Sequence, residues 1–407
     1  MSNTFLTPDM ITRSALVILH QQANFIGNIN RQYDDSFAKA GAKIGDTLRI
    51  RLPNQYTVVN GPTYTDVAQT ELKTTLTIDT WKQVPMFFTD SDLALKIQDF
   101  TDRFVAPAVS VIAASLEANA LSMVEDVYQT VDNFTNVSMS WKNVLDANVL
   151  MTNALTPADG SWVAILRPRD QADIVNANKG LFQSASEIAN QYKKGQMGTS
   201  AGYDFYANTL IPTHTSGTTS ATTGYTVSST ITVSDTTPTT SLTLTKSTAQ
   251  GSWKAGDVLT IATLNAVHPE TKTDTGTVQQ FVVTADVSGG TTDVVVNVSP
   301  AIYMSGARQN VIKTVLSTQA VTKLGESGAI YKQSIFFHPD AFTFATADLE
   351  LPRGVDMASR QVKDGISMRL VRDFDPVYSR MITRLDVLAG KKTLRAQLAA
   401  RVISSGS

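Results

Sequence analysis

One stretch of the 407-residue chain has the spacing of a catalytic motif. Residues 198–202 form a G-x-S-x-G, which in a hydrolase would place the nucleophile Ser200 on a sharp turn, with His338 as a candidate base. Such a turn must follow an apolar strand and open a helix. Here the polar residues 191–195 precede the motif, and the strand-like residues 203–206 follow it. The sequence therefore favours a glycine-rich loop before a strand, and a serine hydrolase using Ser200 is the less favoured alternative.

The other polar residues do not form a recognisable site for a metal or a cofactor. The chain has no cysteine, which excludes thiolate ligands, thiol nucleophiles and disulfides. The histidines are isolated in the sequence, without a second histidine or an acid pair at helical spacing. They are His20, His214, His268 and His338. The sequence contains neither a phosphate-binding loop nor a dinucleotide fingerprint. We therefore expect no catalytic residue, no metal and no cofactor, and this absence favours a structural role.

Composition narrows the class of protein further. Charged residues make up 17% of the chain, below the roughly 25% of soluble domains, so we expect partners to cover much of its surface. The net charge of −2, without a long basic run, argues against a sequence-specific nucleic-acid binder. We recognise no signal peptide and no window of about 18 apolar residues. The sequence therefore predicts no membrane span and synthesis in the cytoplasm.

The longest predicted element is a helix over residues 101–131. Apolar residues recur there at three- and four-residue intervals, the pattern of one amphipathic helix. They are Phe104, Val105, Val109, Ile112, Leu116, Ala120, Met123 and Val127. Thr101 is a candidate N-cap, and Pro107 should kink the helix or delay its start. At about 1.5 Å per residue the helix would be on the order of 45 Å long. Flat subunits of protein shells need such a helix, although an ordinary core helix of a large enzyme has the same pattern.

Two strands joined by a long polar loop predict a projecting hairpin. Residues 47–52 alternate strictly between apolar residues and arginines, and residues 72–78 repeat the apolar alternation. Residues 54–71 between them are mostly polar and contain an Asn-Gly-Pro turn signal at 60–62. Such a long loop in a compact domain usually serves a function, and an open strand edge often binds another chain. We predict contacts to a second chain through Arg49, Arg51, Tyr56, Val58, Val59 and Tyr64.

The rest of the chain alternates between mixed and all-β regions. An amphipathic arm occupies residues 1–36, with a helix start at 7–9. A helix at 141–155, a strand at 161–166 and a helix at 169–177 predict an α/β unit, which resumes at Gly328 and closes with a hairpin over 367–388. Short threonine-rich strands with regular turns between residues 215 and 318 predict an inserted barrel or sandwich.

Several segments in this order resemble one protein family. They are DRFVAPA at 102–108, GYDFYANTLIP at 202–212, AVHPETK at 266–272, QQFVV at 279–283, FHPDAF at 337–342 and LVRDFD at 370–375. The chain resembles the major capsid protein of tailed phages, the Hong Kong 97-type fold, and most closely the gene-five coat protein family of short-tailed phages. The resemblance implies an α+β fold with an N-terminal arm, an extended β-hairpin loop, a long spine helix, peripheral and axial domains, and an inserted all-β barrel domain.

The resemblance also implies a division of the chain. It assigns residues 1–36 to the N-terminal arm, 37–90 to the extended loop, 91–155 with 365–407 to the peripheral domain and its spine helix, 156–214 with 319–364 to the axial domain, and 215–318 to the inserted β domain. Some relatives crosslink a lysine to an asparagine. Lys73 lies near the loop, but no residue is recognisable as its partner, so we predict no crosslink.

The function implied by the resemblance is that of a coat protein. Such a protein self-assembles as pentamers and hexamers into the icosahedral shell that encloses the double-stranded DNA of a tailed bacteriophage. Assembly would proceed in the host cytoplasm through a scaffolded precursor shell that expands as DNA is packaged. The implied partners are further copies of the chain, a scaffolding protein, a portal and DNA bound without sequence specificity, with no membrane. A host nanocompartment shell of the same fold, filled with cargo instead, is the alternative.

Overall fold

The computed structural model describes residues 23–31, 47–59, 61–62, 64, 71–89, 106–136, 138–178, 199–219, 224–231, 238–246, 251–290, 293–312, 315, 317–363 and 366–405. The chain folds into two compact units. The first comprises Met1–Ile50, Lys73–Leu121 and Phe342–Leu394, and the second comprises Arg51–Leu72, Ser122–Ala341 and Arg395–Ser407. The helix starts predicted at 7–9 and at Thr101 lie outside the described residues.

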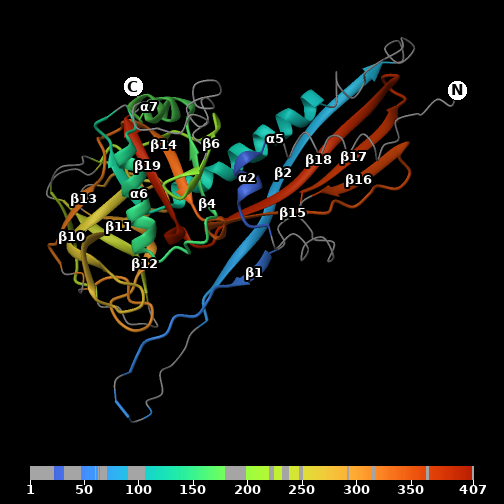
Figure 1. Cartoon of the computed structure of the whole chain (residues 1–407). Coiled ribbons are helices and arrows are strands. Elements are labelled where there is room, and N and C mark those ends of the chain that lie inside the picture. Colours follow the sequence, from blue (N-terminus) through green and yellow to red (C-terminus); the bar gives the residue numbers. More distant parts are fainter. Residues whose placement is uncertain are drawn as a thin grey trace. The chain divides into compact units, whose positions relative to one another are not determined.

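The first unit is built on a long sheet with a helix along it. The strands run in the order β1 (Thr47–Arg51), β2 (Lys73–Thr89), β18 (Arg380–Thr393), β17 (Ile366–Asp375) and β16 (Met357–Lys363), and β15 (Phe342–Ala347) also pairs with β18. Helix α5 (Ala106–Leu121) lies beside β2 and β18, and the short helix α2 (Asn24–Asn28) contacts α5 (Figure 1). The predicted hairpin of 367–388 is confirmed as the antiparallel pair β17 and β18.

Strand alternation places the core of this unit as the sequence predicts. Ile50, Leu76 and Ile78 are buried in one cluster with residues of β15 and β18, while Arg49 and Arg51 are exposed. Alternate side chains of a strand point to opposite faces of the sheet. The arginines of β1 are therefore on the face away from this cluster.

The helix prediction for residues 101–131 is correct in part. Helix α5 is described from Ala106, with Pro107 in its first turn, where a missing N–H removes no helical hydrogen bond. The α-helix ends at Leu121, a 3-10 helix η2 (Ser122–Asp126) follows, and β3 (Thr130–Asn133) is a strand. The predicted continuation to residue 131 is therefore wrong. Residues 130–133 are a strand because β3 pairs in parallel with β19 (Ala399–Ser405), which is far away in the sequence. The local spacing of apolar residues does not reveal β19 as the partner.

The same helix corrects the expectation about apolar windows. The helical segment Pro107–Asp126 contains an 18-residue window with a mean hydropathy of 1.4, so it is long and apolar enough to cross a membrane by length and composition. The prediction that no such window exists is therefore wrong. A core helix passes the same test, and 56% of this window is buried inside the protein.

The second unit contains a mixed sheet covered by helices. Its strands run in the order β3, β19, β14 (Ile330–Phe337), β4 (Trp162–Leu166), β6 (Tyr203–Ala207) and β5 (Thr199–Ser200), and β7 (His214–Thr215) pairs with β14. Helix α6 (Trp141–Asn153) packs against β19 and β3, and α7 (Pro168–Asn178) follows β4. A capping box between Ser140 and Asn143 fixes the start of α6. The predicted helix–strand–helix segment is confirmed.

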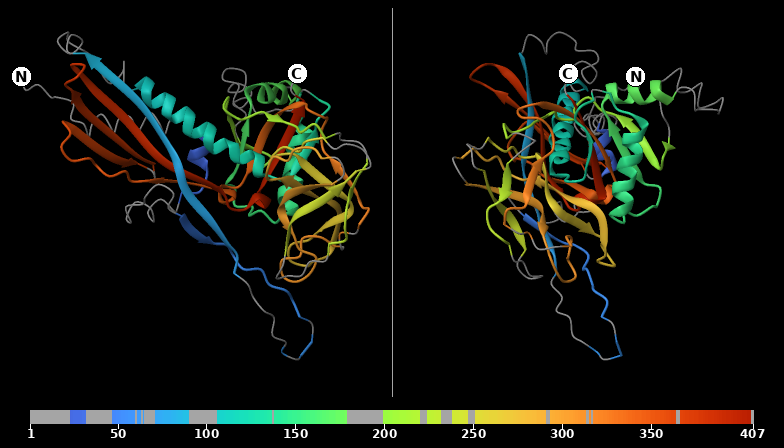
Figure 2. Two further views of the ribbon diagram at one scale, coloured as in Figure 1. Left: turned by 180° about the vertical axis from the view of Figure 1, so that it is seen from behind. Right: turned by 90° about the vertical axis from the view of Figure 1, so that its left-hand side faces the viewer.

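A closed barrel is inserted between β7 and β14. Its strands are β8 (Tyr225–Val227), β9 (Thr239–Thr245), β10 (Val258–Val267), β11 (Asp274–Val283), β12 (Asp293–Ile302) and β13 (Ala320–Lys323), in the order β10-β11-β12-β9-β8-β13. Figure 2 shows the barrel mainly in yellow and orange. Along β12, Val294, Val296 and Val298 are buried in the barrel and Val295 is exposed. The inserted all-β barrel is confirmed, and its last strand lies beyond residue 318.

Candidate functional site

The hairpin loop, residues 52–72, has its predicted binding residues exposed. Its ends are joined by a hydrogen bond from the Leu52 amide to the Leu72 carbonyl (2.9 Å). Its described residues between those ends form no helix or strand. The exposed fractions are 62% for Tyr56, 87% for Val58, 47% for Val59 and 87% for Tyr64. The structure therefore places these four side chains at a surface, and their contact to a second chain stays a prediction.

The two predicted arginines lie on β1, which leads into the loop. Both are exposed, as the strand alternation predicts. Arg51 Nε lies 3.7 Å from Glu71 Oε2, and the side chains are 77% and 50% exposed. An ion pair so exposed contributes ~0–1 kcal/mol. This pair therefore does little to hold the hairpin loop in one conformation.

An exposed face of the first sheet, which the sequence analysis missed, carries aromatic rings with arginines stacked on them. The Arg380 guanidinium lies 4.7 Å from the Tyr378 ring centroid and 5.5 Å from that of Phe87. Two further guanidinium groups lie 5.6–5.9 Å from the Trp81 ring. Tyr378 and Phe87 are exposed. We name Trp81, Phe87, Tyr378 and Arg380 the aromatic face. Aromatic and arginine side chains are enriched in the centres of protein interfaces.

A buried carboxylate holds the arginines beside Trp81. Asp386 is fully buried, and its Oδ2 accepts hydrogen bonds from Arg369 Nη2 (2.6 Å) and Nε (3.2 Å). Its Oδ1 lies 2.8 Å from Arg384 Nε and accepts a hydrogen bond from the Trp81 indole N–H (3.3 Å). The sequence did contain one signal for the aromatic face: Arg380, Ile382 and Arg384 follow each other at every second residue and so lie on one side of β18. Arg384 lies on the same strand as Asp386, but Arg369 and Trp81 lie on other strands, so sequence spacing could not identify these two partners.

The G-x-S-x-G motif forms a hairpin turn. Ser200 pairs with Tyr203 across the antiparallel strands β5 and β6, and Ala201 and Gly202 between them have φ of 51° and 84°. A two-residue turn with two positive φ values is the usual hairpin connection. The predicted loop before a strand is therefore confirmed, and the strand-to-helix turn that a hydrolase needs is absent from the described part of the motif, residues 199–202. Gly198 lies outside the described residues.

Two histidines have acidic partners that the sequence did not reveal. The His338 Nε2 lies 3.2 Å from Asp159 Oδ2, and the His214 Nε2 lies 2.9 Å from Asp257 Oδ1. These two histidines are isolated in the sequence, but in the folded chain each lies beside a carboxylate. His268 lies in a turn, where its Nδ1 accepts hydrogen bonds from the backbone amides of Glu270 and Thr271. Across the described ranges, no group of three or more histidine, aspartate and glutamate side chains is placed to hold a metal ion.

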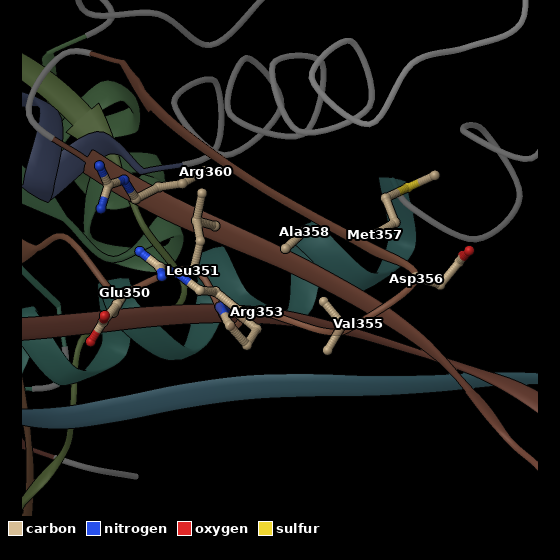
Figure 3. Close-up of a pocket in the computed structure, with 9 residues that line it drawn as sticks. Glu350, Leu351, Arg353, Val355, Asp356, Met357, Ala358 and Arg360 are labelled. Carbon is tan, nitrogen blue, oxygen red and sulfur yellow. The ribbon is translucent and has the colours of Figure 1, made fainter.

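A surface hollow of about 540 Å³ is formed by the connection that follows β15 and by the start of the edge strand β16. Figure 3 shows its labelled side chains spread along the chain instead of converging on one point. The hollow is lined by Glu350, Leu351, Pro352, Arg353, Val355, Asp356, Met357, Ala358 and Arg360. Arg360 and Asp356 each have an ion-pair partner outside the hollow, Asp348 at 3.6 Å and Arg372 at 2.7 Å. Most of its lining is exposed, so it does not favour an enclosed ligand site.

Comparison with known proteins identifies similar chains. The family model described as P22 coat protein, gene protein 5, matches residues 35–400. No curated protein matches the chain. Among solved structures, a chain from Mycobacterium phage Che8 is 11% identical, with 94% of this chain and 90% of that chain covered and a TM-score of 0.46. A chain from the capsid of Ralstonia phage GP4 is 8% identical, with 91% of this chain and 86% of that chain covered and a TM-score of 0.44. A chain from a virus-like particle from Pyrococcus furiosus is 8% identical, with 96% of each chain covered and a TM-score of 0.37. At these TM-scores the structural likenesses add no functional detail.

Proposed function

The chain belongs to the P22 coat protein family, whose model matches residues 35–400, and from this premise we propose that the hairpin loop joins its copies within a phage shell. As a member of that family it is a phage major capsid protein, a coat protein that forms the shell, and it is not an enzyme. Its α+β fold with an inserted barrel is of the Hong Kong 97 type.

The exposure of the loop side chains is the observation that carries the proposal. Ordering a residue costs about 1–2 kcal/mol of conformational entropy, and a loop recovers that free energy only by burying surface. Val58 and Tyr64 are each 87% exposed in the single chain, so they recover little of it there. Full burial of a valine-sized apolar side chain stabilises by about 1.5–3 kcal/mol. A neighbouring subunit that covers these side chains supplies the missing burial, and Arg49 and Arg51 meet its carboxylates.

The division implied by the family resemblance completes the proposed subunit. Residues 1–36 form the N-terminal arm, and residues 37–90 form the extended loop. Residues 91–155 with 365–407 form the peripheral domain. Residues 156–214 with 319–364, apart from the barrel strand β13 (Ala320–Lys323), line the centres of pentamers and hexamers. Residues 215–318 together with β13 form the inserted domain on the shell exterior.

The proposed partners follow from membership in a coat protein family. The subunits assemble in the host cytoplasm on a scaffolding protein, around a portal, and the precursor shell expands as double-stranded DNA enters. The net charge of −2 fits DNA that is enclosed without sequence-specific contacts. No membrane takes part in this scheme.

Electron microscopy of the purified full-length protein tests the role of the loop. Deletion of residues 55–64 should leave a folded monomer that forms no stable shells, because the covered apolar surface is removed. The double variant Val58→Ser, Tyr64→Ser keeps the loop length and should weaken assembly in the same direction. The control Glu71→Gln removes only the exposed ion pair with Arg51 and should assemble normally. Normal shells from the deletion variant would refute the proposal.

A further inference from the structure

The barrel is tied to the second sheet by a buried polar cluster, which we name the barrel root. The chain enters the barrel through Ser216 and Gly217, directly after β7. Asp257 Oδ1 accepts a hydrogen bond from Ser216 Oγ (3.1 Å), and its Oδ2 accepts one from the Gly217 amide (3.1 Å). Lys323, on the last barrel strand, donates from Nζ to Ser216 Oγ (2.6 Å) and to the Gly217 carbonyl (2.7 Å). Both charged side chains are buried, so one carboxylate and one ammonium group fix the entering segment.

Two glycines of the barrel root lie in close contact with its other residues. A Cβ on Gly217 would lie 2.2 Å from the Ser252 carbonyl oxygen and 2.8 Å from Asp257 Oδ2. A Cβ on Gly256, which has φ of +92°, would lie 3.0 Å from the His214 ring. Contacts under 3.0 Å require a neighbour to move, and at Gly217 that neighbour is backbone. Only glycine at these two positions allows the Asp257 carboxylate and the His214 ring to approach the backbone so closely.

Further hydrogen bonds connect the barrel to the sheet around this cluster. The buried Arg401 of β19 donates from Nη2 to the Gly256 carbonyl (2.6 Å). The side-chain amide of Gln280 on β11 accepts from the Thr130 N–H (2.7 Å) and donates to the Thr130 carbonyl (2.9 Å). These bonds contain no group that changes charge near neutral pH. They give the root a basal strength that is independent of pH in that range.

His214 is the group in the root whose ordinary pKa lies near neutrality. Its buried ring has a carboxylate at each nitrogen, Asp257 Oδ1 at 2.9 Å from Nε2 and Glu125 Oε1 at 3.9 Å from Nδ1. A neutral imidazole has one N–H donor, so its other nitrogen would direct a lone pair at a carboxylate. The imidazolium ion donates from both nitrogens. The position of the ring between two carboxylates therefore favours the proton that makes it cationic.

The electrostatic balance points in the same direction. Burial lowers the pKa of His214, but its hydrogen bond to Asp257 and the nearby Glu125 carboxylate raise it by more, so the pKa lies above its usual value. Arg401 opposes the shift by charge repulsion, and burial lowers the pKa of Arg401 itself to about 10. Asp286 in the β11–β12 connection also interacts with His214 and attracts its proton.

The other titratable groups near His214 do not cause a loss of stability as the pH rises through neutrality. Burial lowers the pKa of Lys323, so its contribution to stability increases as the pH rises, which is the opposite sign. Burial opposes ionisation of Asp257, but His214 and Lys323 lower its pKa by more, so its stabilising contribution is lost only in acid. Tyr331, which pairs with His214 across β7 and β14, has a pKa raised above 10.0 by burial. Among the described groups of the root, His214 is the one whose titration between about pH 6 and pH 8.5 lowers stability as the pH rises.

We propose that His214 is a proton-dependent latch between the barrel and the sheet. With its proton, the ring bridges Asp257 of the barrel and Glu125 of η2, and loss of that proton loosens the barrel root. A histidine with a raised folded pKa gives its full stabilisation below its ordinary value near 6.5 and loses it as the pH rises through the folded pKa. The opening constant of the root therefore rises by up to about tenfold per pH unit in that interval. The latch goes beyond the role in shell assembly and depends only on the fold of the subunit.

Hydrogen exchange of the full chain at about pH 6 and about pH 8.5 tests the latch, with each rate divided by its intrinsic rate at that pH. Protection of the Gly217 amide, which is bonded to Asp257, should fall by roughly tenfold per unit of pKa shift. The variant His214→Gln should show no such fall. His338→Gln is the matched control, because His338 is equally buried beside Asp159 but lies outside the root, and it should behave as the wild type. Equal protection of wild-type Gly217 at both pH values would overturn the proposal.

A direct titration covers the case in which His214→Gln fails to fold. In the histidine-labelled wild-type chain, the NMR titration of the His214 ring should give a pKa above about 6.5. The variant Glu125→Gln removes one carboxylate and should lower that measured pKa and reduce the pH dependence of Gly217 protection. A wild-type pKa at or below the ordinary value, or no change in Glu125→Gln, contradicts the latch.

Discussion

Replacement of Asp386 by asparagine should destabilise the first sheet by about 3 kcal/mol, the lower end of the range for breaking a buried ion pair. The carboxylate is fully buried and accepts two hydrogen bonds from Arg369, whose side chain is only 12% exposed. Asparagine keeps one oxygen but turns an NH2 group toward a guanidinium donor, which leaves a buried charge without its counter-ion. The side chain of Arg384 is 37% exposed and remains hydrated, so loss of its ion pair with Asp386 adds little to the destabilisation.

A matched pair on the neighbouring strand gives the control. Arg380 Nε lies 3.2 Å from Asp375 Oδ2, but these side chains are 33% and 17% exposed. Asp375→Asn keeps an oxygen for the Val377 amide that Asp375 Oδ1 now accepts. It should therefore cost ~1 kcal/mol or less. Both substitutions change aspartate to asparagine beside an arginine in the same hairpin, so burial is the main difference between them.

Urea unfolding measured by fluorine NMR on the fluorotryptophan-labelled chain separates the two units. Trp81 is the one tryptophan in the sequence of the first unit, so its resonance reports that unit alone. The midpoint for Trp81 should fall clearly in Asp386→Asn and little in Asp375→Asn. Equal shifts in the two variants would refute the reasoning that burial sets the contribution of each ion pair.

Two further predictions concern the hairpin turn and the barrel. Ser200→Ala should leave shell assembly unchanged by electron microscopy and thermal stability within ~0.5 kcal/mol, because Ser200 lies in a turn; loss of a measurable esterase activity in that variant would contradict this. A fragment of residues 215–328 should fold with a β-type circular dichroism spectrum, whereas a fragment of residues 215–318 lacks β13 and should be less stable to urea. A random-coil spectrum from the longer fragment would show that the barrel needs the rest of the chain.

The sequence alone predicted most elements whose burial pattern is local. Alternating residues gave the strands of the barrel and β1, and three-four spacing gave α6 and α7, because each pattern reflects the geometry of one segment. The exposure of Tyr56, Val58 and Tyr64 was predictable for the same reason, since few apolar residues lie near them in the loop. Local pattern did not show that α5 ends at Leu121. Met123, Val124 and Val127 continue the helical spacing, and they are buried although the α-helix has ended before them.

Only the tertiary structure decided which charged groups meet. Asp386 holds arginines from two strands, and His214 lies between carboxylates from η2 and the start of β10. The sequence fixes the type of each side chain, but the register of the strands determines its neighbours, and a one-residue change of register turns every side chain to the other face. Burial then sets the strength of each pair, and burial depends on the whole packed unit. The sequence therefore could not reveal the contacts of His214 or those of Asp386 with Arg369, whereas it did predict the hairpin loop.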